Sequence, residues 1–390
     1  MTDVTIVDTN VTKFGNINDL SYRELLGEAA RPILQRGAIP AQNIEGLLIA
    51  AGQPELLVDQ AHVANLATET LGLSPKYVNR VEMACSSGGV AIRQAYAAIK
   101  SGLVDNVLVV GLEKMNENPK AASHGLCLVP DVLYESNIGQ TAYAGFALFA
   151  RAHMEKYGTT RENLSQISVK NHAFGQKNPK AQFYKHKMLP VTIEKVRNSP
   201  LVAEPLTLLD CSPISDGAAA VLLSRKDKVK NPEVPVDIIA SAQRTERAFN
   251  MSSIESFTEF TTLQKASQDA YNMAGISPSA INVAETHDCF TIAEIMEYEA
   301  LKFCETGKGG KFIEDNQSYP GGKVVVNPSG GLKAKGHPIG ATGVAQIVSI
   351  TEQLQGTAIG IQTPNPMYGL THNLSGYATN HVVHILKRSD

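Results

Sequence analysis

Cysteine is scarce in the sequence, and the 390 residues contain only five: Cys85, Cys127, Cys211, Cys289 and Cys304. Their number is odd, they are widely spaced, and no Cys-x-x-Cys pair occurs. These features disfavour a disulfide framework and a structural zinc site, and they are typical of proteins in a reducing cytosol. We therefore expect a cytoplasmic protein.

The sequence also has neither a large charge excess nor a long apolar run. The formal net charge is −3, so a broad attraction to nucleic acid or to an anionic membrane is not expected. No apolar run approaches the roughly 20 residues that span a bilayer. The first residues, MTDVTIVDTNVTKFG, begin with a strand-like alternation, so no secretory signal is expected. The 43% apolar and 19% charged content is typical of a soluble globular protein.

Strand-like apolar runs alternate with helix-period segments along most of the chain, which predicts an α/β protein. The stretch from about 116 to 205 differs, because it is rich in Lys, His, Asn and Pro and has less regular periodicity. We interpret this stretch as an insertion that covers one face of the α/β core. A faint internal repeat relates LQRGAIPAQNIEGLLIA (34–50) to YNMAGISPSAINVAETH (271–287). A repeat with so long a period indicates a duplicated domain instead of a solenoid.

Local signals place several helix starts and strands. The apolar run NVLVVG (106–111) predicts a buried strand. The alternation after Asn380 predicts a closing strand, with His372 and Asn373 in the turn before it. Three pairs have the spacing of a capping box and predict helix starts: Ser21 and Glu24, Thr159 and Glu162, and Thr291 and Glu294.

The segment NRVEMACSSGGVAIRQAYAAIKSG places Cys85 where an extended stretch changes into a helix. The unpaired N–H groups and the positive dipole end of a helix N-terminus favour a thiolate over a thiol. Gly88 and Gly89 would let a ligand or another backbone approach closely. Cys85 is therefore a candidate nucleophile. The alternative is a buried cysteine that acts as a small hydrophobic residue.

The segment VVVNPSGGLKAKGHPIGATGVAQIVSI combines a strand-like run, a glycine-rich loop and a helix. Gly331 and Gly336 have the GxxxxG spacing of a phosphate-binding loop, but His337 stands where that loop needs lysine, so nucleotide triphosphate binding is not expected. Pro338 would hold His337 rigidly at the mouth of a glycine-lined pocket. Such a histidine could take a proton from a thiol, and a structural histidine is the alternative.

The segment THDCFTI (286–292) places His287 and Cys289 at a second strand-to-helix junction. Such a cysteine can be a metal ligand, a catalytic group or a core residue. Tetrahedral zinc needs about four ligands. His287 and Cys289 supply at most two, and no second cluster has suitable spacing. We therefore expect no metal site.

Taken together, these motifs resemble those of the thiolase family. The Cys85 segment, continued by VLVVGLEKM, resembles the family's nucleophile segment. LLDCSPISDGAAAVLLS (208–224) resembles its Asp-Gly-Ala segment, and NPSGGLKAKGHPIGATG resembles its Gly-His-Pro segment. The three occur in family order over nearly the whole chain. The resemblance implies that Cys85 is the nucleophile and that His337 is the base that activates it.

The resemblance also implies the architecture: a thiolase-like, duplicated α/β fold of five layers, αβαβα, with an inserted loop domain. On this basis we place the N-terminal half at residues 1–115 and 206–245, the loop domain at 116–205, and the C-terminal half at 246–390. A homo-oligomer, either a dimer or a dimer of dimers, is implied as well.

The chain departs from the commonest thiolases in two motifs. It has His287-Asp288 where they usually carry Asn-Glu, and THNLSGY where they usually carry Cys-x-Gly. This combination resembles the sterol-carrier-protein-x type thiolases and the archaeal acetoacetyl-CoA thiolases. It implies that Cys289 is a relocated acid/base, with His287 and His337 as hydrogen-bond donors to an enolate oxygen. A backbone N–H near Gly376 would face the tetrahedral oxyanion.

The substrates implied by the resemblance are coenzyme A thioesters, with no further cofactor. His153 and Met154 lie roughly where the family contacts CoA. Basic residues of the predicted loop domain could also meet the nucleotide phosphates, and a solvated basic loop is the alternative: Lys177, Lys180, Lys185 and Lys187.

The resemblance predicts an acetyl-CoA C-acetyltransferase (acetoacetyl-CoA thiolase) that condenses two acetyl-CoA through an acetyl-cysteine and feeds the mevalonate pathway. It implies that archaeal members work in a complex with HMG-CoA synthase, bridged by a small OB-fold, zinc-ribbon protein. The alternatives are degradative thiolysis of longer or sterol-derived 3-oxoacyl-CoA, retro-aldol cleavage, and a non-catalytic channelling subunit. Cys85 argues against retro-aldol cleavage, and Cys85, Cys289 and His337 together argue against a channelling subunit.

Overall fold

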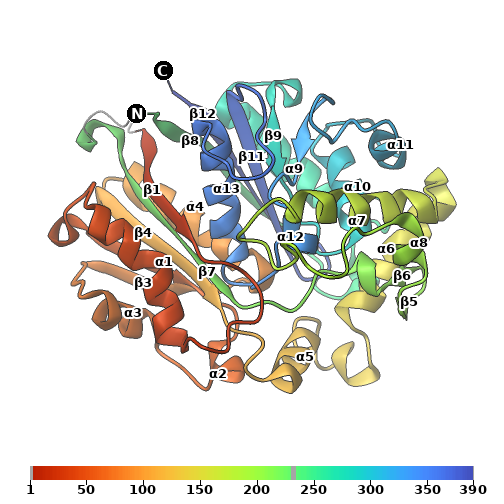
Figure 1. Cartoon of the computed structure of the whole chain (residues 1–390), viewed down its shortest axis with the longest axis horizontal. Helices are drawn as coiled ribbons and strands as arrows, with labels where there is room; N and C mark the ends of the chain where they lie inside the picture. The colour runs from red at the N-terminus through yellow and green to blue at the C-terminus, as the bar shows by residue number, and fades with distance from the viewer. Residues whose placement is uncertain (1–2, 230–233, 390) are drawn as a thin grey trace.

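One ten-stranded mixed sheet organises the part of the chain that the computed structural model describes, residues 3–229 and 234–389 (Figure 1). The strand order is β10-β9-β11-β12-β8-β1-β7-β4-β2-β3. The two halves of the sheet are joined where β1 and β8 pair antiparallel over two residue pairs. The strands are β1 Val4–Val11, β2 Gly46–Ala50, β3 Tyr77–Val81, β4 Asn106–Glu113, β7 Gly217–Arg225, β8 Val236–Thr245, β9 Val283–Glu285, β10 Val325–Val326, β11 Tyr368–Ser375 and β12 Asn380–Arg388.

The two halves of this sheet repeat the same topology. Read outward from the centre, one half runs β1-β7-β4-β2-β3 and the other runs β8-β12-β11-β9-β10. In both halves the first two pairings are antiparallel and the last two are parallel. The duplication predicted from the faint sequence repeat is therefore present in the fold. The second copy begins at β8, so the strand 236–245, which the sequence places in the first half, belongs by topology to the second.

The sequence repeat itself corresponds to matching local structure. Gly37 and Gly275 each end a helix in the left-handed conformation, with φ of 65° and 66°. A short 3-10 turn follows each glycine, and then a parallel strand, β2 or β9. Glycine suits both positions because a side chain is disfavoured at positive φ.

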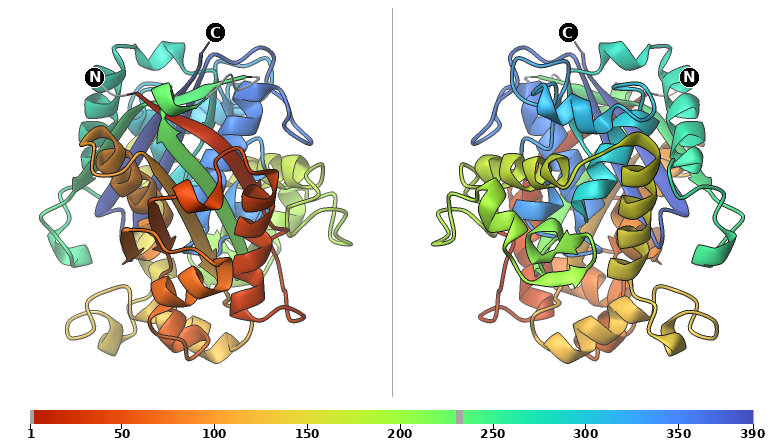
Figure 2. Two further views of the ribbon diagram at one scale, coloured as in Figure 1. Left: turned by 90° about the vertical axis from the view of Figure 1, so that its left-hand side faces the viewer. Right: turned by 90° about the vertical axis from the view of Figure 1, so that its right-hand side faces the viewer.

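Helices form three layers around and between the two half-sheets (Figures 1 and 2). Helices α1 and α3 cover the outer face of the first half. Helices α4 and α13 lie between the halves, and α13 contacts β4 and β7 on one side and β9 and β11 on the other. Helix α9 packs on β8 and β12 from outside, with α10 beside it. The bounds are α1 Tyr22–Arg36, α3 Val63–Leu71, α4 Ser87–Lys100, α9 Thr261–Ala274, α10 Thr291–Ala300 and α13 Thr342–Gln355.

Strand β4 is buried along its whole length because helices cover both faces of the sheet there. All eight residues of β4 are buried, which confirms the strand predicted at 106–111. The closing strand after Asn380 is also confirmed as β12. His372 and Asn373, however, lie within β11 and not in a turn, so that prediction is wrong.

Two of the three predicted capping boxes differ in the structure. Ser21 and Glu24 form the expected box at the start of α1. At α7, Arg161–Gly175, the box is one residue later and uses Thr160 and Asn163. At α10 no side chain caps the helix, because Thr291 donates to Asp210 and the carboxylate of Glu294 accepts from Lys170.

The stretch predicted as an irregular insertion is more helical than its sequence suggested. Between β4 and β7 it forms α5 Pro119–Cys127, α6 Ala142–Tyr157, α7 and α8 Ile193–Arg197, and a two-stranded sheet of β5 Leu201–Ala203 and β6 Leu206–Thr207. Helix α7 hides its periodicity because it buries polar residues, among them Lys170, Asn171 and His172. Figure 2 shows this segment along one side of the molecule.

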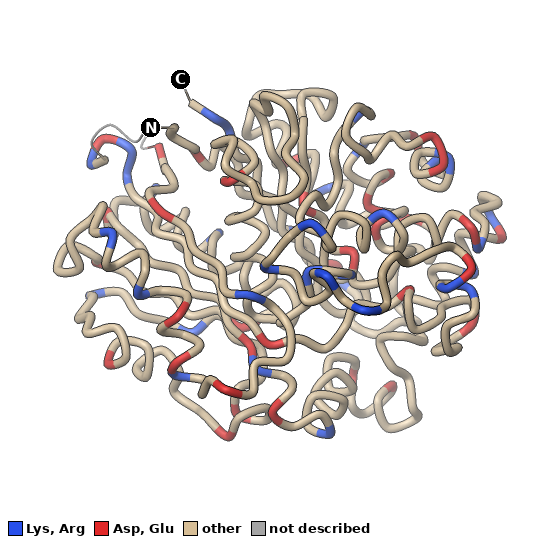
Figure 3. The backbone as a smooth tube through the Cα atoms, in the orientation of Figure 1, with Lys and Arg blue, Asp and Glu red and all other residues tan. Residues whose placement is uncertain are grey.

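Charged residues of both signs are interspersed along the backbone (Figure 3). None of the described helices combines the length and the apolar character needed to cross a membrane.

The crossing of α4 and α13 in the central layer depends on glycine. A Cβ at Gly343 would overlap the backbone nitrogen of Gly89 and the side chain of Asn373. We expect Gly343→Ala to destabilise the fold by about 2–4 kcal/mol, because the α4 backbone that the new Cβ would meet cannot give way. Urea unfolding measures this. A loss below about 0.5 kcal/mol would show that the two helices can separate without cost.

Candidate active site

Four chain segments that are distant in sequence meet in one pocket. Cys85 enters from the turn between β3 and α4, and His287 and Cys289 from the connection of β9 to α10. His337 comes from the loop between the four-residue helix α12, Gly331–Ala334, and α13. Gly376 follows β11. The structure thus brings together the five residues that the sequence nominated for acyl chemistry.

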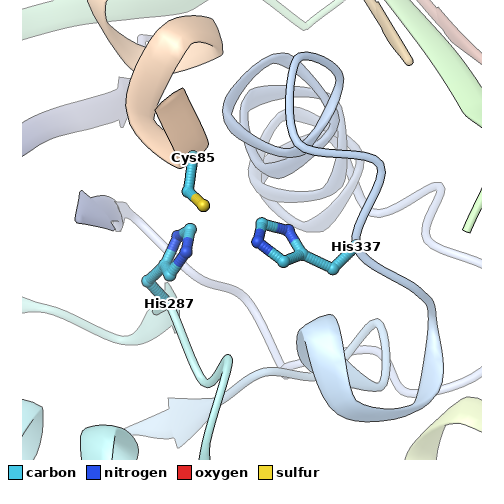
Figure 4. Close-up of side chains that lie close together, drawn as sticks. All are labelled: Cys85, His287 and His337. Carbon is cyan, nitrogen blue, oxygen red and sulfur yellow. The ribbon is translucent and has the colours of Figure 1, made fainter. Parts of the chain in front are cut away.

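Cys85, His287 and His337 form the centre of this pocket (Figure 4). One side-chain atom of each, the sulfur or a ring nitrogen, lies within 4.8 Å of the others. The two imidazole rings meet edge to face, with centroids 5.0 Å apart at 88°. Figure 4 shows both rings directed toward the sulfur at the start of α4.

Hydrogen bonds define the tautomer of His337. Its Nδ1 lies 2.7 Å from Thr342 Oγ1, and the Thr342 hydroxyl donates its only proton to the carbonyl of Pro338 at 3.0 Å. Thr342 must therefore accept from Nδ1–H, which leaves a lone pair on Nε2. His337 Nε2 is buried and has no partner among the described residues. It is thus an acceptor ready for the Cys85 proton.

The contact between Thr342 and His337 leads to a mutational prediction. Thr342→Val keeps the shape of the side chain but removes the acceptor for Nδ1–H. We expect kcat for the acyl transfer that the sequence predicts to fall about ten- to hundredfold, which is part of the rate that a positioned general base contributes. Thr342→Ser keeps the hydroxyl and should retain most activity. A valine variant with an unchanged kcat and pH–rate profile would contradict a positioning role for Thr342.

His287 has the opposite tautomer. Its Nδ1 lies 3.4 Å from Asn373 Nδ2, which also donates to Gln346 Oε1 at 2.6 Å. Gln346 Nε2 in turn donates to the carbonyl of Thr286 at 2.9 Å, which sets the orientation of both amides. His287 Nδ1 is therefore an acceptor and Nε2 carries the proton. Nε2 is buried and has no partner among the described residues, so it can donate to a substrate oxygen.

Burial dominates the protonation of all three groups. It raises the pKa of Cys85 to about 12, with a smaller contribution from the nearby carboxylate of Glu113. It lowers the pKa of His337 to about 3 and that of His287 well below its usual range. The resting site is therefore a thiol with two neutral imidazoles. The thiolate that the helix N-terminus predicted is not favoured, because burial outweighs the dipole.

Cys289 lies in the same pocket as Cys85 and is 6% exposed. Its position is fixed by the backbone, since its N–H donates to His287 O at 2.7 Å and its carbonyl accepts from Ser212 N–H at 2.9 Å. Burial raises the pKa of its thiol well above the usual value, followed by the charges of Cys85 and Glu297. The thiols of Cys85 and Cys289 are therefore both protonated at rest, and each needs a neighbouring base to lose its proton.

Gly376 adopts the left-handed conformation, with φ of 61°, in the turn between β11 and β12. It lines the pocket beside Leu374. The role of the Gly376 N–H as a hydrogen-bond donor to an oxyanion stays a prediction. The other walls are mainly apolar, and the ring of Phe290 stacks on Phe146 at 4.5 Å and meets Tyr143 edge to face at 6.0 Å.

The close cluster of Cys85, His287 and His337 also has the spacing of a metal site. Its hydrogen bonding does not suit one. A ligating histidine offers a lone pair and donates its other N–H. Only His337 has that arrangement, because Nε2 of His287 carries a proton. Tetrahedral zinc needs four ligands, so the cluster fits acid–base chemistry better than metal binding.

The residues nominated for CoA binding do not line this pocket. His153 is fully buried and contacts Thr159 at 2.8 Å and Glu299 at 3.3 Å, so it has no exposed atom to offer a nucleotide. Met154 is partly buried against the apolar core of the second half. Lys185 is exposed, with its ammonium 5.0 Å from the Tyr184 ring centroid. The burial of His153 therefore speaks against its predicted contact with CoA.

Sequence reasoning overlooked the residues that orient the two histidines: Thr342, Gln346 and Asn373. A signal was present, because Thr342 and Gln346 lie one turn apart on the buried face of α13. Polar side chains on an otherwise apolar helix face are uncommon unless they have a partner.

Comparisons with known proteins find matches along most of the chain. Residues 4–227 match the model of the thiolase N-terminal domain, and residues 243–388 match that of the thiolase C-terminal domain-like family. The acetyl-CoA acetyltransferase of Methanothermobacter thermautotrophicus is 39% identical over 100% of both chains. That of Methanocaldococcus jannaschii is 40% identical over 99% of both. Bovine sterol carrier protein 2 is 34% identical over 95% of this chain and 70% of its own length.

Solved structures show the same fold. The Ltp2–ChsH2(DUF35) aldolase superimposes with a TM-score of 0.84 at 24% identity, covering 99% of this chain and 98% of that chain. Human mitochondrial 3-ketoacyl-CoA thiolase superimposes with a TM-score of 0.75 at 17% identity, covering 100% and 99%. With both domain models matched and full-length relatives near 40% identity, the chain belongs to the thiolase family and is an acyltransferase.

Proposed function

We propose that this protein is an acetyl-CoA C-acetyltransferase, which joins two acetyl-CoA through an acetyl group carried on Cys85. Full-length relatives with that name support the substrate. The observation that carries the proposal is the convergence of Cys85, His337 and His287 within 4.8 Å, with Cys289 in the same pocket. Coenzyme A thioesters are the only small molecules this chemistry requires.

In the first half-reaction, Nε2 of His337 takes the proton of the Cys85 thiol and the thiolate attacks the acetyl carbon. The C–S bond to CoA breaks, and the leaving CoA thiolate takes the proton of Cys289. The products are acetyl-Cys85, protonated His337, a Cys289 thiolate and free CoA. The imidazolium and the thiolate are each disfavoured by burial, and they offset one another's charge in the pocket.

In the second half-reaction, the Cys289 thiolate removes a proton from the methyl group of a second acetyl-CoA. Nε2–H of His287 and Nε2–H of protonated His337 both donate to the enolate oxygen that forms. The carbanion attacks the acetyl carbon of acetyl-Cys85, and the backbone N–H groups of Cys85 and Gly376 would face the oxyanion. Collapse releases acetoacetyl-CoA and the Cys85 thiolate, which takes its proton back from His337.

Degradative thiolysis of longer or sterol-derived 3-oxoacyl-CoA is the competing function. The apolar walls formed by Tyr143, Phe146 and Phe290 could also hold a longer acyl chain. Thiolysis of acetoacetyl-CoA compared with a series of longer homologues separates the two. We expect kcat/KM to be highest for acetoacetyl-CoA, and a strong preference for long chains would refute the proposal.

Retro-aldol cleavage has less support. The aldolase that shares the fold is 24% identical, which speaks for the architecture alone. Retro-aldol cleavage needs no cysteine nucleophile, and Cys85 in contact range of two histidines would have no purpose in it. The same argument opposes a non-catalytic channelling subunit.

The cellular setting is part of the proposal. We infer that the enzyme works in the cytoplasm as a dimer or a dimer of dimers and feeds the mevalonate pathway. We further propose a complex with HMG-CoA synthase, bridged by an OB-fold, zinc-ribbon protein. Native co-purification with mass spectrometry tests the partners, and a lone, fully active oligomer would count against them. Neither nucleic acid nor a membrane is expected as a partner.

A further inference from the structure

A chain of buried polar side chains runs from α10 to the turn between β11 and β12, and the mechanism above does not use it. His381 Nε2 lies 2.7 Å from the carbonyl oxygen of Ala378, and His381 Nδ1 lies 3.0 Å from His372 Nε2. His372 Nδ1 lies 3.4 Å from Glu297 Oε1. Glu297, His372 and His381 are all fully buried. Polar groups at such depth are expected to satisfy one another.

The acceptors of this chain determine where its protons lie. Burial lowers the pKa of His372 to about 3 and that of His381 well below its usual range, so both rings are neutral. A backbone carbonyl can only accept, so His381 Nε2 carries the proton and Nδ1 has the lone pair. His372 Nε2 must then donate to His381 Nδ1, which leaves the lone pair of His372 on Nδ1. One proton is therefore needed between His372 Nδ1 and Glu297 Oε1, because two buried lone pairs at that distance repel each other.

Glu297 can supply that proton. Neither its Oε1 nor His372 Nδ1 has a hydrogen-bond partner elsewhere in residues 3–229 and 234–389. Burial raises the pKa of the Glu297 carboxyl to about 8. At neutral pH Glu297 is therefore an uncharged acid, and its O–H is available to His372 Nδ1. The chain then has a donor for every acceptor from α10 to the carbonyl of Ala378.

Other groups around Glu297 act on its pKa in both directions. Thr286, the backbone of His287 and the charge of Lys170 lower it, and the charge of Glu294 raises it. Lys170 and Glu294 are paired with each other, so their charges largely cancel at Glu297. Burial therefore remains the dominant effect. Two titratable groups in the turn before α10 also interact with the Glu297 charge: Asp288 and Cys289.

The far end of the chain holds a strained turn of the active site. Residues 376–379, which we call the Gly376 turn, connect β11 to β12, and Gly376 lines the pocket. Ala378 has a φ of 58°, a left-handed conformation that is disfavoured for a residue with a side chain. Such a conformation persists where the surrounding structure holds it. The hydrogen bond from His381 to the Ala378 carbonyl supplies that restraint.

Resting on the acetyl-transfer function proposed above, we propose that Glu297, His372 and His381 are positioning residues, which hold the Gly376 turn in place through one continuous chain of hydrogen bonds. The chain begins on α10, the helix that follows Cys289, and ends at the turn that follows β11. It therefore fixes these two sides of the pocket relative to each other. The Gly376 N–H is thereby held where the oxyanion forms.

Glu297→Leu and Glu297→Gln are a matched pair that separates a donated proton from simple packing. Leucine fills a similar space without a donor, whereas the glutamine amide can still donate to His372 Nδ1. We expect kcat of the leucine variant to fall about ten- to hundredfold, which is less than the loss of a whole oxyanion donor, with KM changed less than about twofold. The glutamine variant should stay within about threefold of the parent at neutral pH. Glu299→Gln, a control at another buried acid of α10, should leave kcat within about twofold.

A double variant tests whether the residues act as one chain. His381→Leu removes the donor to the Ala378 carbonyl and should lower kcat to a similar extent as Glu297→Leu. We expect the double variant to lose no more than about twofold beyond His381→Leu alone, because residues that act as a unit are not additive. Losses that multiply would overturn the chain.

The pH dependence of kcat gives a readout that packing alone would not change. Above about pH 8 the Glu297 carboxyl loses its proton, the chain loses a donor, and kcat of the parent should fall. Glutamine has no proton to lose in this range, so kcat of Glu297→Gln should stay level. This comparison stands even if the leucine variants do not fold. An alkaline decline that is the same in both proteins, or absent from the parent, would overturn the proposal.

Hydrogen exchange with mass spectrometry tests the turn without measuring acyl transfer. Thr379 N–H donates to Ser375 O at 3.2 Å and reports whether the Gly376 turn stays closed. We expect the peptide that contains Thr379 to exchange severalfold faster in Glu297→Leu than in the parent or Glu297→Gln. Faster exchange in a protein without transferase activity would refute the proposed function and leave the role of the chain intact. Unchanged exchange together with an unchanged kcat in Glu297→Leu would overturn the proposal.

Discussion

Replacing Cys85 with alanine should abolish acetyl-enzyme formation and lower acetyl transfer by more than about a thousandfold. The acetyl group is carried on the Cys85 sulfur. Cys85 is the thiol of the pocket that has the free lone pair of His337 Nε2 beside it, and that nitrogen takes the thiol proton. Loss of a nucleophile that acts as a unit with its base typically costs this much or more. The measurement is incubation with labelled acetyl-CoA, followed by counting of label on the denatured protein.

The control for this variant is Cys127→Ala, which removes a thiol that does not line the pocket. It should take up label at the parent rate. Stoichiometric labelling of Cys85→Ala, on Cys289 or on another residue, would contradict the assignment of the nucleophile.

Replacing Cys289 with alanine should separate the two half-reactions. The variant still has Cys85 and His337, so it should form the acetyl-enzyme. It lacks the base that deprotonates the second acetyl-CoA, and we expect condensation to fall about a hundred- to ten-thousandfold, the range of a general base. Rapid-quench assays of acetyl-enzyme and acetoacetyl-CoA measure the two steps separately.

Cys289→Ser is the matched control, because it preserves size and hydrogen bonding but its hydroxyl is a far weaker acid. It should behave like the alanine variant. Normal condensation by either variant would mean that another group removes the proton. It would also remove the reason for a cysteine in the HDCF turn.

Cys85, His287 and Cys289 could be found from sequence because each follows a strand and precedes a helix, and His337 because its glycine-rich loop precedes α13. Glycine-rich turns around Cys85 and His337, and the short segment with His287 and Cys289, are local features that one chain reveals. Their convergence was inferred from the resemblance to thiolases and not from local pattern. The structure supports this convergence. The strand order is repeated in the two halves, and the segments before α4, α10 and α13 line one pocket.

The pKa values and the orientations of the site residues could not be predicted from the sequence in the same way. The pKa of Cys85 depends on how completely distant segments bury it, and the helix N-terminus alone suggested the wrong direction. The tautomers of His287 and His337 depend on Asn373 and Thr342, which reach them only in the folded chain. His153 was misplaced for a similar reason: its position in sequence resembled a ligand site, but α6 turns it inward toward Glu299.

The most direct test of the proposed mechanism is a thiol cross-link across the pocket. Dibromobimane joins two sulfurs only when they lie close together, and peptide mass spectrometry identifies the joined residues. We predict a single bridge between Cys85 and Cys289 in the native protein, lost in either alanine variant and blocked by prior acetylation of Cys85. If the reagent modifies each cysteine singly, or forms bridges that never include Cys289, the two sulfurs do not share one acyl group and the mechanism is wrong.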